Sequence, residues 1–136
     1  MVSLFDEGEL ILEFPTIFGI STSLRAYKLA FYLTQHRNIE VYAREDLEDY
    51  GSKNTYINYV IHNLDEQREY LLIKNKGEKG WYYPSYKKVD YLLCSLTEEG
   101  VSEDLTQQIA STIGVSICFV LNKPNQKEIL NFTKLL

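Results

Sequence analysis

The spacing of apolar residues along the chain alternates between the two-residue repeat of strands and the longer repeat of helices. Near the N-terminus, apolar side chains alternate over residues 10–14 and continue over residues 17–20. This pattern predicts a first strand that is bent or bulged at Pro15, because proline is tolerated in strands mainly at such irregular positions.

The repeat becomes helical from Leu24. Apolar residues at helical spacing then define one face, and the positive residues His36 and Arg37 fall in the last turn, where the helix dipole favours them. Hydroxyl side chains just before Leu24 predict an N-cap. The apolar face consists of Leu24, Tyr27, Leu29, Ala30, Phe31 and Leu33, and the capping candidates are Ser21, Thr22 and Ser23.

Four strands are predicted in the middle of the chain. Alternation over residues 39–43 is typical of a half-exposed strand. Residues 56–61 and 69–73, rich in β-branched and aromatic side chains, predict a hairpin around a turn at 63–66. The apolar run 89–96 is typical of a central strand with both faces covered. The polar stretches 45–54 and 75–80 are interpreted as loops.

The last third of the chain predicts a second helix and two more strands. Ser102 is the predicted N-cap, and apolar residues recur every four positions from Val101 to Ile113. Gly114 is the expected end of this helix. Residues 115–121 predict another buried strand. Residues 128–136 fit either a strand or a helix, and a closing strand is the favoured prediction.

This order of elements predicts an α+β domain: a mostly antiparallel sheet with two helices packed on one face, in the order strand, helix, four strands, helix, two strands. The chain has 136 residues, with 7 glycines and 3 prolines, and no segment is typical of an interdomain linker. We therefore expect one domain over residues 1–136.

Charge narrows the classes of partner. The chain has 14 basic and 19 acidic side chains, a formal net charge of −5, which argues against broad binding to nucleic acid or to anionic membranes. The acidic N-terminus does not resemble a secretory signal, and no apolar run is long enough to span a bilayer. We expect a cytoplasmic protein, in which Cys94 and Cys118 serve as buried apolar residues.

No motif for catalysis, a metal or a cofactor is recognisable. The glycines do not form a phosphate-binding or dinucleotide-binding pattern, and the cysteines have no ligand at zinc spacing. A triad of Ser21, His62 and Asp90 has no support from spacing. The acidic run 45–49 lacks the pattern of a calcium loop and is interpreted as solvated. The sequence therefore predicts no catalytic residues, no metal ligands and no cofactor.

Residues 81–91 form the segment with the most unusual composition. Trp81, Tyr82, Tyr83 and Tyr86 surround Pro84, which favours an extended approach to the following strand. The aromatic residues could either cap the core or form a recognition patch. Asp90 would need a partner in a covered strand, because an unpaired buried carboxylate is costly. The candidate partners are Arg25, Arg44 and backbone amides.

The same segment resembles the signature of the IPExxxVDY family of bacterial proteins. Pro84, Val89, Asp90 and Tyr91 match the motif, whereas Tyr83 replaces its isoleucine and Ser85 its glutamate. A second segment, residues 19–33, is similar to the N-terminal strand-to-helix region of that family. The resemblance implies a bacterial protein and assigns no activity. If the motif glutamate were catalytic, Ser85 would leave this chain without it.

Three hypotheses for function follow. The first is a non-enzymatic protein-interaction domain, for example a homodimer, that uses a sheet edge or the aromatic residues 81–86. The second is a site for a small molecule or an anion, with or without catalysis, between the start of the first helix and Asp90. Its candidate residues are Ser21, Ser23, Arg25, Tyr27 and Asp90. The third is RNA binding by stacked tyrosines, against which the net charge counts.

Overall fold

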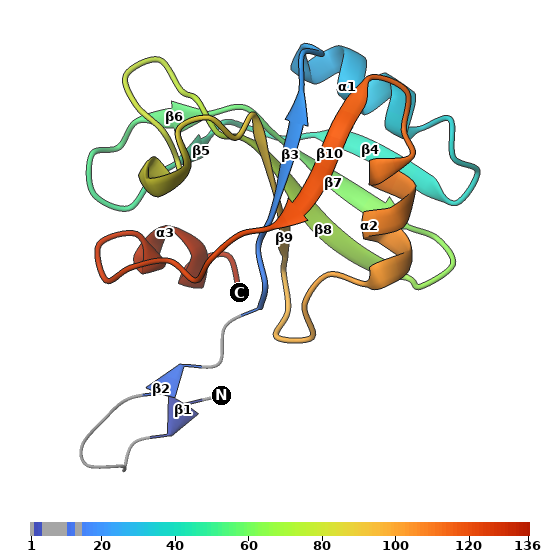
Figure 1. The fold of residues 1–136 in the computed structure, drawn as a ribbon. Coiled ribbons are helices and arrows are strands. Elements are labelled where there is room, and N and C mark those ends of the chain that lie inside the picture. The colour runs from blue at the N-terminus through green and yellow to red at the C-terminus, as the bar shows by residue number, and fades with distance from the viewer. Residues whose placement is uncertain (1, 4–10, 13–14) are drawn as a thin grey trace.

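The computed structural model describes residues 2–3, 11–12 and 15–136, and its main feature is a six-stranded antiparallel sheet (Figure 1). Its strands are β3 (Phe18–Thr22), β4 (Ile39–Ala43), β7 (Asn58–Asn63), β8 (Arg68–Lys74), β9 (Tyr91–Ser95) and β10 (Val115–Val120). They lie in the order β10-β3-β9-β8-β7-β4, and every neighbouring pair is antiparallel. The α+β class with a mostly antiparallel sheet is therefore confirmed.

The smaller elements surround this sheet. Two short strand pairs are formed by β1 (Val2–Ser3) with β2 (Ile11–Leu12), and by β5 (Leu47–Glu48) with β6 (Thr55–Tyr56). The helices are α1 (Ala26–Leu33), α2 (Glu103–Ala110) and α3 (Ile129–Thr133), with a 3-10 turn, η2, at Pro84–Tyr86. The strand predicted over residues 10–20 is thus two strands, β2 and β3, although residues 10 and 13–14 lie outside the described residues.

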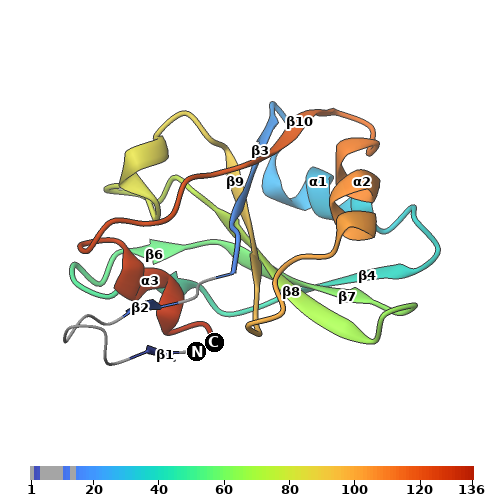
Figure 2. The same cartoon turned by 60° about the horizontal axis from the view of Figure 1, so that its bottom comes forward.

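Alternation along the central strands divides the core into two layers. In β8, Tyr70 and Leu72 pack with the side chains of α1 and α2, whereas Leu71 and Ile73 pack with α3 and the tyrosines near η2. All four β8 side chains are fully buried. Figure 2 shows α1 and α2 together over one part of the sheet and α3 away from them. A strand with both faces covered explains its nearly continuous apolar sequence.

The first helix is shorter than predicted and buries only part of the predicted apolar face. It begins at Ala26, and the N-cap residue Arg25 makes no side-chain cap, so capping by the hydroxyls of residues 21–23 is wrong. Leu29 and Leu33 are buried, whereas Tyr27 and Phe31 are 61% and 58% exposed. These two pairs lie about 200° apart around a helix, so only one pair can face the sheet.

Three other predictions of secondary structure are corrected. His36 follows α1, which ends at Leu33, and its Nε2 lies 2.9 Å from Thr112 Oγ1, so His36 does not occupy the last turn. The loop predicted at 45–54 contains β5. The tail predicted as a strand forms α3 instead, which buries Phe132 against an aromatic cluster.

The second helix follows its prediction closely. Ser102 is the N-cap, and its hydroxyl accepts a hydrogen bond from the backbone amide of Leu105. Leu105 and Ile109 are buried, as the four-residue repeat predicts. Ile113 is 70% exposed, because the helix ends at Ala110 and the chain turns towards β10 at Gly114, where φ is +88°.

The strand predicted at 115–121 exists, but its predicted burial is wrong. β10 lies at an edge of the sheet, and Ile117 and Val120 are 51% and 61% exposed. Among the described residues, no helix is both long and apolar enough to cross a membrane.

Close packing at Gly19 gives a test of the fold. A Cβ atom added to Gly19 would lie 2.9 Å from Leu121 Cδ2 and 3.1 Å from Val89 Cγ1, whereas one added to Gly51 would meet nothing within 4 Å. We expect Gly19→Ala to lower the free energy of unfolding by about 1–3 kcal/mol through overpacking. Gly51→Ala should change it by less than about 0.5 kcal/mol. Urea denaturation measures both, and equal effects would contradict the packing around Gly19.

Candidate functional site

The segment 81–91 is held in place by one buried side chain, Asn75. The Asn75 amide group donates to the carbonyls of Tyr86 and Val89 at 2.8 and 3.1 Å, and its Oδ1 accepts from the backbone amide of Tyr83 at 2.8 Å. The Asn75 backbone adds bonds to Tyr82 and Asp90, at 2.8 and 3.0 Å. Instead of the predicted extended arm, the segment therefore folds back around Asn75 through η2.

Tyr82 and Tyr83 belong to the core. They are 0% and 1% exposed, and their hydroxyls donate to the backbone carbonyls of Asn131 and Asn122 respectively. Burial raises the pKa of both phenols well above the usual range. The predicted recognition patch is therefore wrong for these two residues, and the interpretation that they cap the core is the one observed.

Asp90 finds its partner in a backbone amide. Its Oδ2 accepts from the amide of Thr22 at 3.0 Å, and the residue is exposed, so it is not a buried charge. The next residue, Tyr91, donates from its hydroxyl to the carbonyl of Leu24 at 2.8 Å. Thr22 Oγ1 accepts from Leu24 and donates to Gly114. These bonds fix the link from β3 to α1 against the start of β9.

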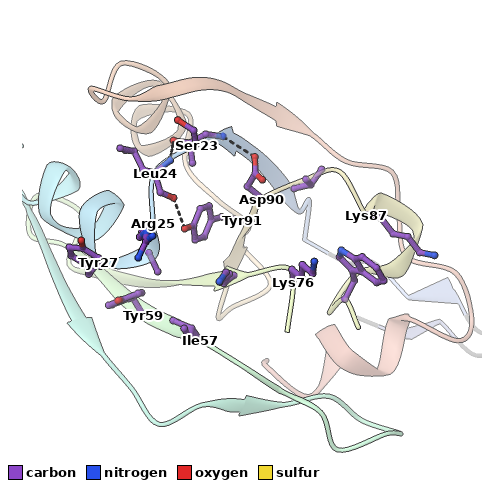
Figure 3. Close-up of a pocket in the computed structure, with 15 residues that line it drawn as sticks. Ser23, Leu24, Arg25, Tyr27, Ile57, Tyr59, Lys76, Lys87, Asp90 and Tyr91 are labelled. Carbon is purple, nitrogen blue, oxygen red and sulfur yellow. Dashed lines mark hydrogen bonds between the residues drawn. The ribbon is translucent and has the colours of Figure 1, made fainter. Parts of the chain in front are cut away.

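This arrangement borders a cleft of about 620 Å³ between the start of α1 and residues 81–91 (Figure 3). A cleft of this size is within the range of small-molecule sites. In the close-up, Tyr27 and Tyr59 lie towards one end of the cleft, and Lys76 and Lys87 lie towards the other. The lining residues that carry charge or an aromatic ring are Arg25, Tyr27, Tyr59, Lys74, Lys76, Trp81, Lys87, Asp90 and Tyr91.

The cleft is positively charged within an acidic chain. Four basic side chains line it against one carboxylate, that of Asp90, although the whole chain has a formal net charge of −5. Within the part of the chain that the structure describes, none of the four forms an ion pair. Their positive charge is therefore available to an anion that enters the cleft. The four are Arg25, Lys74, Lys76 and Lys87.

Trp81 provides an aromatic wall at the lysine end. The ammonium groups of Lys76 and Lys87 lie 5.8 and 5.0 Å from the centre of its ring, both within cation–π range. Lys76 also pairs with Trp81 through an isolated β-bridge, which fixes their backbones side by side. Both ammonium groups therefore lie over the indole ring.

The structure brings together five of the predicted site residues and separates the others. Ser23, Arg25, Tyr27, Trp81 and Asp90 line the cleft. Ser21 and Tyr86 line a neighbouring groove, and Tyr82 and Tyr83 lie in the core.

The sequence interpretation missed the lysines and Tyr59. A signal for two of them exists, because Lys74 and Lys76 are two residues apart at the end of a predicted strand and so share one face. Nothing in the sequence placed Lys87 or Tyr59 beside them.

Ser85, the residue that stands at the motif's glutamate position, has a structural contact. Its backbone amide and hydroxyl both donate to the carboxylate of Glu128, at distances of 2.8–2.9 Å. Glu128 is 5% exposed and also accepts from Asn125. Ser85 therefore ties η2 to the segment that leads into α3.

The cysteines and the acidic residues are the remaining candidates for chemistry. Burial raises the pKa of the Cys118 thiol to about 11 and that of Cys94 still further, so both thiols are poor nucleophiles at neutral pH. Among the described residues, no three His, Cys, Asp or Glu side chains lie close enough to hold a metal ion.

Comparison of the chain with protein-family models, curated proteins and solved structures found no match. Membership of the IPExxxVDY family therefore stays a prediction from the motif, and the function must be argued from the site itself.

Removing the Asn75 side chain tests its role in shaping the site. Asn75→Ala leaves the buried amide of Tyr83 and the carbonyl of Val89 without partners, whereas the carbonyl of Tyr86 keeps its bond from the Val89 amide. We expect the free energy of unfolding to fall by about 2 kcal/mol or more, since each buried unsatisfied group costs about 1–3 kcal/mol. Urea denaturation measures this loss, and Asn122→Ala, at an exposed position, is the control variant. A loss below about 1 kcal/mol for Asn75→Ala would contradict this role.

Alkaline pH tests the burial of Tyr91. Burial, with a smaller contribution from the Asp90 charge, raises the pKa of Tyr91 from 10.0 to about 12. The folded state therefore holds this proton more tightly than the unfolded state. The corresponding stability is complete below pH 10 and is lost as the pH rises to about 12. We expect the free energy of unfolding to fall over that interval, and to fall less steeply in Tyr91→Phe. Identical slopes for the two proteins would contradict the assignment.

Proposed function

We propose that the cleft between α1 and residues 81–91 binds a small anionic molecule that carries a flat apolar ring. The observation that carries this proposal is the convergence of Arg25, Lys74, Lys76 and Lys87 on one cleft of about 620 Å³ that also contains Trp81. Aryl phosphates, nucleotides and aromatic carboxylates belong to this class of ligand.

Charge is the first argument. In a chain with a formal net charge of −5, basic side chains without ion pairs in the described structure repel one another where they converge. A bound anion would relieve this repulsion. The β3-to-α1 link contributes backbone dipoles as well, because α1 begins at Ala26 beside the cleft and helix N-termini favour negative charge.

The aromatic lining is the second argument. Tyr27, at the start of α1, is 61% exposed. It lines the cleft together with Tyr59 and Trp81. Ring faces at these positions provide apolar contact area for a flat group. Asp90 uses Oδ2 for the amide of Thr22, and its other oxygen could accept a hydrogen bond from the ligand.

This proposal is the second of the three hypotheses from the sequence. The first hypothesis relied partly on Tyr82 and Tyr83, which are buried and cannot meet a partner. The second required Asp90 to lie near the start of the first helix, and Asp90 is bonded to Thr22 at the end of β3. A cleft that would hold one small ligand also suits a mononucleotide better than a continuous RNA strand.

Trp81 is the only tryptophan in the chain, so its fluorescence reports directly on the cleft. We expect phenyl phosphate and adenosine monophosphate to change this fluorescence with saturation, and to bind more tightly than inorganic phosphate, which has no ring. The dissociation constants should rise with added sodium chloride, because salt screens exposed charges over about 10 Å at 0.1 M.

Substitution of one lysine provides the matched comparison. Lys76→Gln should weaken binding of phenyl phosphate by about threefold to fivefold, since an exposed ion pair contributes up to about 1 kcal/mol. Lys28→Gln removes the same charge from an exposed position of α1 outside the cleft and should leave binding unchanged. Absence of any saturable fluorescence change, or equal weakening by both variants, would refute the proposal.

A further inference from the structure

A second candidate binding surface is the outer edge of β10, the strand at one end of the six-stranded sheet. This strand pairs with β3 on one side, and among the described residues no strand pairs with its other side. Its outward backbone amides and carbonyls are therefore open to another strand. Ile117 to Val120 pair regularly with Ser21 to Phe18, after a register shift between Val115 and Ile117. Over these four residues the strand therefore presents a regular edge to a neighbour.

The sequence of β10 is typical of a strand inside a sheet. Val-Ser-Ile-Cys-Phe-Val contains no charge and no proline. Cys118 packs on the helix side of the sheet and Phe119 on the other side, so apolar residues point to both faces. Ile117 and Val120 nevertheless remain 51% and 61% exposed. Uncharged strands with apolar residues on both faces are typical of positions inside a sheet, where a strand pairs with a neighbour on each side.

The opposite edge of the sheet is protected in the usual way. β4 carries the exposed charge of Glu40, and the exposed residue Arg44 follows directly after its last residue. Charged side chains at an edge discourage pairing with other chains. The two edges therefore differ: only β10 lacks this protection within the described sheet.

A groove of about 580 Å³ extends the apolar surface beside this edge. Its apolar lining consists of Ile117 and Phe119 of β10 and of Pro84, Tyr86 and Val89 of the neighbouring turn. The polar residues Ser21, Ser85, Lys87 and Lys88 complete the lining. Side chains from a strand added next to β10 would be neighbours of Ile117 and Phe119, which line this groove. Edge backbone and groove together provide the hydrogen bonds and the apolar contact that β-strand addition needs.

We propose that two copies of this chain pair through β10, antiparallel about a twofold axis, so that their six-stranded sheets become continuous. A second copy is the occupant that the composition selects. Antiparallel pairing of this strand with itself places uncharged residues opposite uncharged residues, and a twofold axis satisfies both edges equally. β10 carries no charge that would favour a strand of a different sequence. Each copy has a formal net charge of −5, so electrostatic repulsion disfavours contact through other surfaces.

Sedimentation equilibrium of the full chain tests the proposal. The protein should have twice the mass of one chain at micromolar concentration. Ile117→Lys brings two like charges together at the twofold interface and should raise the dissociation constant of the dimer by at least about tenfold. Tyr42→Lys, at a position of β4 that is 50% exposed, makes the same change at the other edge and should leave the dimer intact.

Hydrogen exchange separates pairing through β10 from dimerisation by another surface. Backbone amides of β10 that point outward should exchange more slowly at concentrations where the dimer forms, and the difference should disappear in Ile117→Lys. Circular dichroism of that variant confirms that it remains folded, because Ile117 is an exposed position. A monomeric wild-type protein, a dimer that resists Ile117→Lys, or exchange in β10 that does not depend on concentration would each overturn the proposal.

Discussion

The buried amide of Asn75 is the interaction on which the arrangement of residues 81–91 depends. One side chain and its backbone make five hydrogen bonds, to residues 82, 83, 86, 89 and 90. Buried backbone groups need such partners, and a folded-back segment cannot supply them from a regular ladder. Because Asn75 lies between Lys74 and Lys76, the residue that organises the segment also places two basic side chains at the cleft. Shape and charge of the cleft therefore have a common origin.

The acidic and basic side chains around the cleft are held in place in different ways. Asp90 is held by the amide of Thr22, so the only carboxylate in the lining is already occupied on one oxygen. The basic side chains are positioned by their backbones instead: Arg25 at the N-cap of α1, Lys74 and Lys76 at and just after the end of β8, and Lys87 directly after η2. A rigid frame with long cationic side chains can adapt to anions of different length. For the proposed anion, this arrangement would favour recognition of a chemical class over recognition of a single molecule.

Local patterns in the sequence predicted those parts of the fold that local interactions determine. The β7–β8 hairpin and the Ser102 cap of α2 follow from neighbouring residues alone. The face of α1 did not, because Tyr27 and Leu29 begin competing stripes and only the sheet decides between them. The predicted site was incomplete for the same reason. Asp90 and Arg25 have distinctive local settings, whereas Lys87 and Tyr59 reach the cleft only through the tertiary fold.

The contact between Ser85 and Glu128 shows that a distant part of the chain brings a carboxylate to η2. Ser85 replaces the glutamate of the motif that the sequence resembles, yet a carboxylate lies within 2.9 Å of its hydroxyl, delivered from 43 residues further along. A negative group is thus present beside η2 although the linear pattern lacks it. Loss of the Glu128 carboxylate would therefore remove the negative group beside η2 while leaving the linear pattern of residues 84–91 unchanged.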